Sequence, residues 1–207
     1  MNVIFKNIPN LLTCLNLTLG LISISFSYKG NLQLGTILIF SGLFIDFFDG
    51  FFARLLSSNS EFGKQLDSLA DLVTFGIAPS TIIFQLIHYK IFNTYFFESL
   101  NTDFSTAYLA FIFPVFGAIR LAKFNLDTKQ QENFVGLPIP AAGIFLASLS
   151  FFDEKILNIN ILFLSLFTLS VLLVSKINLF SLKIKNYDIN KSRINFFRII
   201  LIVSSLI

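Results

Sequence analysis

Residues 46–71 read DFFDGFFARLLSSNSEFGKQLDSLAD, which places four aspartates within an otherwise apolar part of the chain. Their spacing is regular and can be written D-x2-D-G-x2-A-R-x8-G-x3-D-x3-D. Ionisable side chains at membrane depth are costly, and they usually face a polar cavity in which they carry function. Four acids so close together therefore indicate a functional site rather than packing.

Both halves of this stretch have helical spacing. In the first half the motif positions lie at i, i+3, i+4, i+7 and i+8 from Asp46, and in the second they lie at i, i+4 and i+8 from Gly63. Each set therefore shares one helix face. Between them, residues 55–60 interrupt the apolar pattern with small polar side chains and predict a turn. Two antiparallel helices would then bring the four carboxylates together.

The acids predict a site for a hard divalent cation. Carboxylates that converge repel one another, and a bound cation keeps them ionised. Oxygen ligands without His or Cys suit Mg²⁺ or Mn²⁺ and suit zinc poorly. Small residues on the same faces permit close helix approach or leave room for a flat ligand; they are Gly50, Ala53 and Gly63. The predicted metal ligands are Asp46, Asp49, Asp67 and Asp71.

The composition is that of a membrane protein. Hydrophobic residues make up 55% of the 207 residues, charged residues make up 13%, and the mean hydropathy is +0.77. These values argue against a soluble globular domain. Apolar runs able to cross about 30 Å of hydrocarbon predict an all-α, polytopic transmembrane bundle. Its six core helices are expected near 8–28, 32–56, 62–88, 105–125, 137–152 and 156–176.

The distribution of basic residues predicts the orientation. With a cytoplasmic N-terminus, the outer connections hold only Lys29, Lys90 and Lys155, and the other 12 of the 15 Lys and Arg residues lie on the inner side. The acidic stretch would then lie at the cytoplasmic surface. A formal net charge of +3 on a membrane protein gives no reason to expect a nucleic-acid partner.

At its fixed positions the acidic stretch resembles the signature of the CDP-alcohol phosphatidyltransferases, integral membrane enzymes that displace CMP from a CDP-linked lipid with an alcohol. Other segments are similar to the bacterial phosphatidylserine synthases of this family. They are IPNLLT at 8–13, DSLADLVTFGIAPS at 67–80, RLAKFN at 120–125 and GLPIP at 136–140. The resemblance implies CDP-diacylglycerol and L-serine as substrates, surrounding membrane lipid, a homodimer and a place in the bacterial inner membrane.

The resemblance runs over roughly residues 8 to 177, so residues 1–177 are assigned to the catalytic transmembrane domain. Residues 178–207 are assigned to a basic cytoplasmic segment followed by a C-terminal apolar segment. The apolar run 194–207 is too short to span a bilayer, and we interpret it as the start of a further helix of a longer chain. No cleavable signal is expected at the N-terminus, because Pro9, Asn10 and Asn16 interrupt its apolar run.

The resemblance also implies roles for individual residues. The four aspartates would hold one or two divalent ions at the pyrophosphate, and Asp71 would also be the general base that takes the proton from the serine hydroxyl. For Arg54, contact with the pyrophosphate is favoured over a role as an anchor at the helix end. The residues expected to contact the CDP-lipid are Asn10, Thr13, Asp49, Gly50, Ala53, Arg54 and Gly63.

Recognition of serine requires a cation for its carboxylate. Arg120 is the first candidate, because it lies at the inner end of the predicted fourth helix and can make a bidentate contact. The alternative is a side chain that extends along the helix end to reach water. Lys123 and Asn125 are further candidates for serine binding.

Other functions remain open at this stage. Glycerol phosphate, inositol or inositol phosphate as acceptor would keep the same chemistry, but a phosphorylated acceptor should need more cations near the site than Arg120 and Lys123. A cation or proton transporter would also use acids within the membrane. It is disfavoured because the acids gather at one membrane face. A purely structural protein would have no reason to place four acids together.

Overall fold

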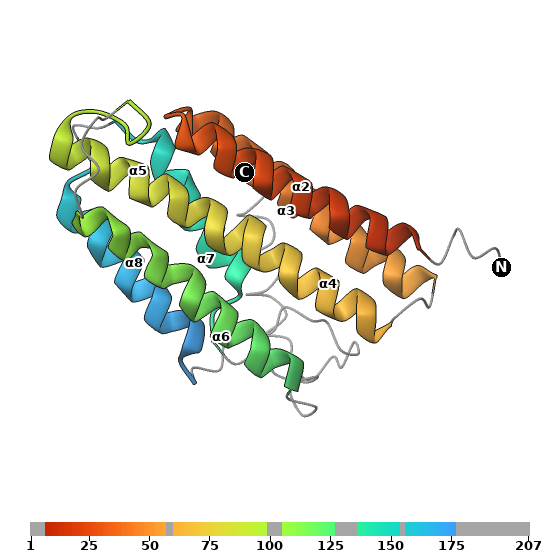
Figure 1. The fold of residues 1–207 in the computed structure, drawn as a ribbon. Coiled ribbons are helices and arrows are strands. Elements are labelled where there is room, and N and C mark those ends of the chain that lie inside the picture. Colours follow the sequence, from red (N-terminus) through yellow and green to blue (C-terminus); the bar gives the residue numbers. More distant parts are fainter. Residues whose placement is uncertain (1–6, 57–59, 99–104, 127–135, 154–155, 177–207) are drawn as a thin grey trace, which may run out of the picture.

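The structure, a computed structural model, describes residues 7–56, 60–98, 105–126, 136–153 and 156–176, and all regular elements in these ranges are helical (Figure 1). The α-helices are α2 (Ile8–Tyr28), α3 (Leu32–Leu55), α4 (Glu61–Asp71), α5 (Ala78–Phe92), α6 (Ile112–Leu126), α7 (Ile139–Ser148) and α8 (Ile159–Val174). Shorter elements are the π-helix η1 (Leu72–Ile77) and the 3-10 helices η2 (Thr106–Phe111) and η3 (Leu149–Phe151).

These elements join into the expected long helices. Elements α4, η1 and α5 form one continuous helix, as do η2 with α6 and α7 with η3. Four helices of the described part are long and apolar enough to cross a membrane, namely Ile8–Tyr28, Leu32–Leu55, Glu61–Phe92 and Thr106–Leu126. Ile139–Phe151 and Ile159–Val174 are shorter apolar helices. The prediction of a polytopic bundle is confirmed, whereas the segment 178–207 lies outside the described residues.

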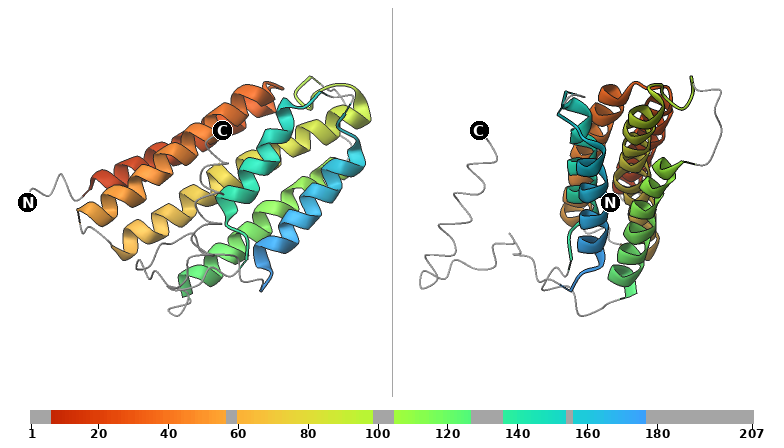
Figure 2. Two further views of the ribbon diagram at one scale, coloured as in Figure 1. Left: turned by 180° about the vertical axis from the view of Figure 1, so that it is seen from behind. Right: turned by 90° about the vertical axis from the view of Figure 1, so that its left-hand side faces the viewer.

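The helices form two layers. Helices α2, α4–α5 and α6 face the viewer in Figure 1, and α3, α7 and α8 face the viewer from behind (Figure 2). Helices α2 and α3 pack closely because small residues line their contact. The Ser23 hydroxyl donates to the Gly35 carbonyl at 2.8 Å, and a Cβ at Gly35 would collide with Ser27 Oγ.

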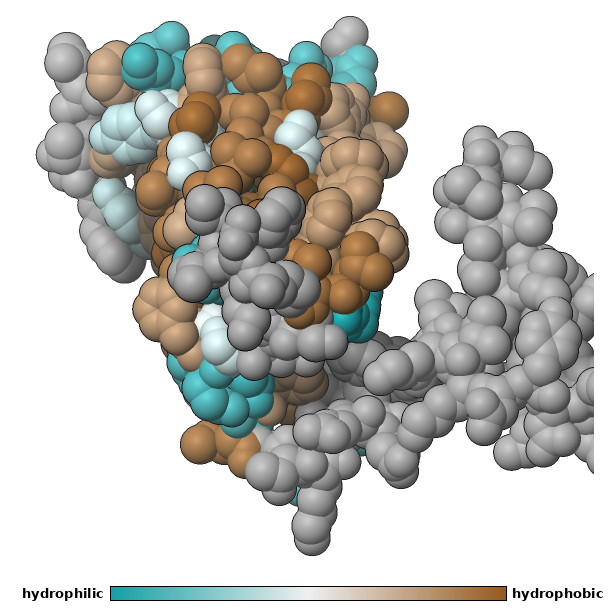
Figure 3. Space-filling view, turned by 90° about the vertical axis from the view of Figure 1, so that its right-hand side faces the viewer, coloured by the Kyte–Doolittle hydropathy of each residue, from teal (hydrophilic) through white to brown (hydrophobic). Residues whose placement is uncertain are grey.

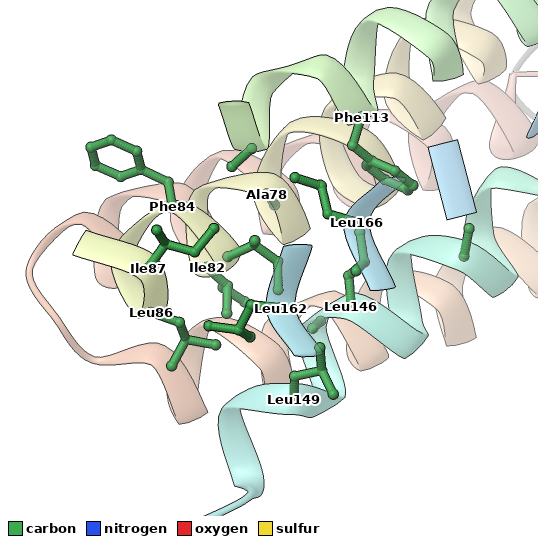
Figure 4. Close-up of a cluster of buried hydrophobic side chains, with 14 of the residues drawn as sticks. Ala78, Ile82, Phe84, Leu86, Ile87, Phe113, Leu146, Leu149, Leu162 and Leu166 are labelled. Atoms are coloured by element: carbon green, nitrogen blue, oxygen red, sulfur yellow. The ribbon is translucent and has the colours of Figure 1, made fainter. Parts of the chain in front are cut away.

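A dry apolar core lies at the end of the bundle away from the acids. Ala78 and Ile82 on α5 face Leu146 of α7 and Leu162 and Leu166 of α8, and all five side chains are fully buried (Figure 4). This core fixes α5 in the bundle and thereby fixes α4, which continues the same helix.

The outer surface of the bundle is strongly apolar. On α3 the side chains of Phe44, Phe47 and Phe51 are 65%, 63% and 45% exposed. In the face shown in Figure 3, apolar side chains cover the middle, and hydrophilic ones gather toward the upper and lower ends. Patches of this kind suit contact with lipid. Buried polar residues such as Thr13 and Asn16 instead lie inside the bundle.

Candidate active site

The four aspartates of the sequence motif come together where α3 and α4 face each other. Carboxylate oxygens of Asp46, Asp49 and Asp67 all lie within 4.8 Å of one another. Asp71, one turn beyond Asp67 on α4, has its carboxyl group within hydrogen-bonding reach of Asp46. The antiparallel arrangement predicted from the helical spacing therefore exists in the structure.

Two local features hold this arrangement. Ser60 caps the N-terminus of α4, because its hydroxyl accepts a hydrogen bond from the backbone N–H of Gly63 at 3.0 Å. From α2, the Thr13 hydroxyl donates a hydrogen bond to Oδ2 of Asp49 on α3 at 2.7 Å. Asp49 is only 6% exposed, so this bond orients a carboxylate that has little contact with water.

A cavity of about 450 Å³ opens beside the acids. Its walls come from α2, α3, and the start of α4. The lining residues are Pro9, Asn10, Thr13, Asp49, Gly50, Ala53, Ser60, Glu61, Gly63, Lys64 and Asp67. All residues predicted to contact a CDP-lipid are among them except Arg54. Arg54 lies in the last turn of α3 and is exposed. This exposure agrees better with an anchor at the helix end than with a residue that lines the cavity.

The two motif glycines differ in their surroundings. A Cβ at Gly63 would lie 3.0 Å from Oδ1 of Asn10, so this glycine lets α4 approach α2. A Cβ at Gly50 would meet no atom within 4 Å. Helix packing therefore does not require glycine at position 50, and the space in front of it belongs to the cavity.

Arg120 of α6 lies on the far side of the acids. Its side chain is 9% exposed, and its guanidinium interacts electrostatically with Asp71. Its Nε has no hydrogen-bond partner among the described residues. The guanidinium carbon lies 5.9 Å from the centroid of the Phe124 ring. The guanidinium therefore has one buried donor left for a further acceptor, and its burial disfavours a side chain that extends to the membrane surface.

The other two residues predicted to bind serine have different surroundings. Lys123 is exposed. The Asn125 side chain links α6 to α4, because its Nδ2 donates to Ser68 Oγ at 2.9 Å and to Gln65 Oε1 at 3.4 Å. Its Oδ1 is buried and has no partner in the described part of the chain. Asn125 thus joins α6 to α4, with one acceptor atom unused.

The sequence analysis missed Lys64, which lines the cavity. Its Nζ lies 3.3 Å from the backbone carbonyl of Asn125, so it also joins α4 to α6. Lys64 precedes Asp67 by three residues and shares its helix face. That spacing was a signal that could have identified it. Pro9, Ser60 and Glu61 were missed for lack of such a signal.

The residues present fit a divalent cation. Asp46, Asp49 and Asp67 each offer an oxygen within a small space, and the nearby Asp71 has a buried Oδ1 without a hydrogen-bond partner in the described residues. A cluster of bare carboxylates of this kind is destabilised by mutual repulsion. Hard cations with oxygen ligands offset that repulsion.

Comparison with known proteins gives consistent matches. The sequence model of the CDP-alcohol phosphatidyltransferase family matches residues 6–179. A Bacillus subtilis (strain 168) protein named CDP-diacylglycerol–serine O-phosphatidyltransferase is 38% identical over 170 residues, covering 82% of this chain and 88% of the relative. A Helicobacter pylori (strain J99) protein of the same name is 35% identical over 206 residues, covering 96% and 80%. An archaetidylserine synthase of Methanothermobacter thermautotrophicus is 32% identical over 146 residues, covering 70% and 58%.

Proposed function

The chain belongs to the CDP-alcohol phosphatidyltransferase family, and from this premise we propose that it transfers the phosphatidyl group of CDP-diacylglycerol to the hydroxyl of L-serine and releases CMP. This is the activity named for the relatives that match most of the chain. The structural observation that carries the proposal is the aspartate cluster, which has a cavity on one side and the buried Arg120 on the other.

The cavity side suits the CDP-lipid. The space in front of Gly50 admits a flat group such as cytidine, and Lys64 on the same wall offers a positive charge to the pyrophosphate. The family is dependent on divalent metal ions, and Asp46, Asp49 and Asp67, with Asp71, would hold Mg²⁺ or Mn²⁺. Such an ion, when bound, neutralises pyrophosphate charge and stabilises the departing CMP.

The other side suits serine. Arg120 binds the serine carboxylate, and Asp71 accepts the proton from the serine hydroxyl. The hydroxyl oxygen then forms a bond with the phosphorus that carries the lipid, and the bond between that phosphorus and the oxygen of CMP breaks. Lys123 and Asn125 border this side, and Asn125 offers its unused Oδ1 to the serine ammonium group.

We also propose that the enzyme lies in the bacterial inner membrane as a homodimer, with surrounding lipid in contact with its apolar surface and the site open to the cytoplasm. The excess of Lys and Arg on the inner side supports this orientation. In it, a soluble amino acid and a lipid-bound nucleotide reach the site from the same side of the membrane.

A substrate panel tests the proposal. Purified protein in detergent with CDP-diacylglycerol is given serine, glycerol 3-phosphate, inositol or inositol phosphate, and released CMP and the lipid product are measured. Among these acceptors, we expect only serine to cause CMP release. Release with a phosphorylated acceptor and not with serine would reassign the acceptor, and no release with any alcohol would contradict the phosphatidyl transfer itself.

Replacement of Arg120 should affect serine selectively. A charged hydrogen bond contributes about 1.5–3 kcal/mol, so Arg120→Ala should raise the serine KM roughly 10- to 100-fold. Arg120→Lys should raise it less, because an ammonium keeps the charge without the bidentate geometry. The KM for CDP-diacylglycerol should stay close to the parental value. Lys29→Ala, which removes an exposed cation at the outer turn, is the control. A normal serine KM in folded Arg120→Ala would refute the carboxylate role.

Filling the space at Gly50 should affect the nucleotide-lipid selectively. Gly50→Leu puts a side chain into the cavity from a position whose Cβ would meet no atom within 4 Å, and we expect the KM for CDP-diacylglycerol to rise about tenfold or more, in line with the usual cost of overpacking. Ser41→Leu places a leucine at an exposed position of α3, outside the cavity lining, and is the control. Equal KM values for the two variants would place the nucleotide elsewhere.

A further inference from the structure

Asn16 of α2 is a buried polar residue without a visible role in the site. Its side chain is 0% exposed, and neither Nδ2 nor Oδ1 has a hydrogen-bond partner among the described residues. Burial of an unpaired amide costs free energy, so native proteins normally provide such a group with a partner.

The contacts of Asn16 put it at the deep end of the aspartate cluster. On α2 it follows Thr13 by three residues, on the face from which Thr13 donates to Asp49. On α3, its Oδ1 lies 2.9 Å from the position that a Cβ of Gly42 would occupy, one helical turn from Asp46. Its backbone carbonyl accepts a hydrogen bond from the hydroxyl of Thr74 at 3.0 Å.

Thr74 itself lies three residues beyond Asp71. The neighbours of Asn16 on α2, α3 and η1 therefore all put it near the level of Asp46 and Asp71, the two acids farther from the Ser60 cap. The carboxyl groups of Asp46 and Asp71 are within hydrogen-bonding reach of each other. Asp71 Oδ1 is buried and lacks a donor, whereas Asn16 Nδ2 is buried and lacks an acceptor. The two unpaired groups are chemically complementary.

We propose that Asn16 is a positioning residue of the divalent-cation site, whose amide donates to the carboxylates of Asp46 and Asp71 through one bound water. Helix α2 would then place two hydrogen-bond donors beside the acids of α3 and α4. Thr13 donates to Asp49, and Asn16 would donate toward Asp46 and Asp71. The inference rests on the cation site proposed above. Groups that orient metal ligands in this way typically account for about 10- to 100-fold in metal affinity.

The experiment measures Mn²⁺ binding without substrates, by electron paramagnetic resonance of the free ion, with purified protein in detergent. Asn16→Leu keeps the approximate size and removes the donor, and we expect its Mn²⁺ Kd to rise roughly 10- to 100-fold. Asn16→Asp replaces the donor with a further negative group and should also bind less tightly than the parent. Tighter binding by Asn16→Asp would make position 16 a metal ligand and overturn the proposed donor role.

Ser27 provides a matched control. It lies on the same helix, is 0% exposed and has an unpartnered Oγ, but it packs against Gly35, away from the acids. Ser27→Ala should bind Mn²⁺ as the parent does. Equal Mn²⁺ affinity in Asn16→Leu, with thermal unfolding like that of the parent, would overturn the role of Asn16 alone.

Failure of the proposed cation site would look different, because the parent itself would then bind no Mn²⁺. If Asn16→Leu does not fold, the decision falls to Asn16→Ala, which is smaller and has no side-chain donor. Its Mn²⁺ Kd should rise roughly 10- to 100-fold, as expected of Asn16→Leu, and a value equal to that of the parent would overturn the inference.

Discussion

Enzyme treated with EDTA is expected to release no CMP from CDP-diacylglycerol and serine, and added Mg²⁺ or Mn²⁺ should restore the full rate. The oxygens of Asp46, Asp49 and Asp67 converge within 4.8 Å, and the pyrophosphate brings further negative charge to the same place. Without a cation, substrate and site would repel each other, and the leaving group would lack charge stabilisation. CMP release, followed by chromatography, is the measurement.

The control for this experiment is EDTA saturated beforehand with Mn²⁺, which can remove neither Mg²⁺ nor Mn²⁺ from the enzyme and so separates metal removal from effects of the chelator on detergent micelles. A full rate of CMP release after exhaustive chelation would remove the divalent cation from the mechanism. Restoration by Zn²⁺ and not by Mg²⁺ or Mn²⁺ would contradict the expectation from an all-oxygen site.

Asp71→Asn should lower kcat by roughly 10²- to 10⁴-fold, the usual contribution of general acid–base catalysis. Binding of CDP-diacylglycerol should suffer less, because a base acts mainly in the transition state whereas a metal ligand also supports the ground state. Single-turnover CMP release and equilibrium binding of the nucleotide-lipid measure the two effects separately.

Asp67→Asn is the matched comparison, since it lies one turn away on the same face of α4 and lines the cavity. It should weaken both binding and turnover. An Asp71→Asn enzyme with the parental rate, or one whose loss equals that of Asp67→Asn in both measurements, would show that Asp71 is not the base.

Much of the fold could be predicted from the sequence, because apolar runs report directly on membrane helices. The predicted helix 32–56 corresponds to Leu32–Leu55, and 62–88 lies within the continuous helix Glu61–Phe92. The π-helix Leu72–Ile77 could not be predicted. Its sequence, LVTFGI, has no feature that distinguishes a π-helix from an α-helix, and its position is tied to tertiary contacts such as the close approach of Gly143 to the backbone of Phe75.

The site was partly predictable for a similar reason. The acids and Gly50 lie at helical spacing, which fixes their common face before any tertiary contact is known. Arg54 shares the spacing but ends outside the cavity, because the last turn of α3 is exposed. The cross-helix pairs, Thr13 with Asp49 and Lys64 with Asn125, depend on how α2 and α6 pack against α3 and α4, and one chain gives no signal for that packing.

The start of α4 at Ser60 has a consequence for how the two substrates meet. At 1.5 Å of rise per residue, Asp67 and Asp71 lie about 10 and 16 Å along the helix from that cap. In the proposed orientation, with Ser60 at the membrane surface, the phosphorus under attack would lie below the headgroup layer. The lipid donor could then reach the cavity by lateral diffusion with its acyl chains still in the bilayer, while serine would come from water to the side of the acids where Arg120 lies. Turnover then requires no extraction of lipid, only the passage of small, water-soluble molecules.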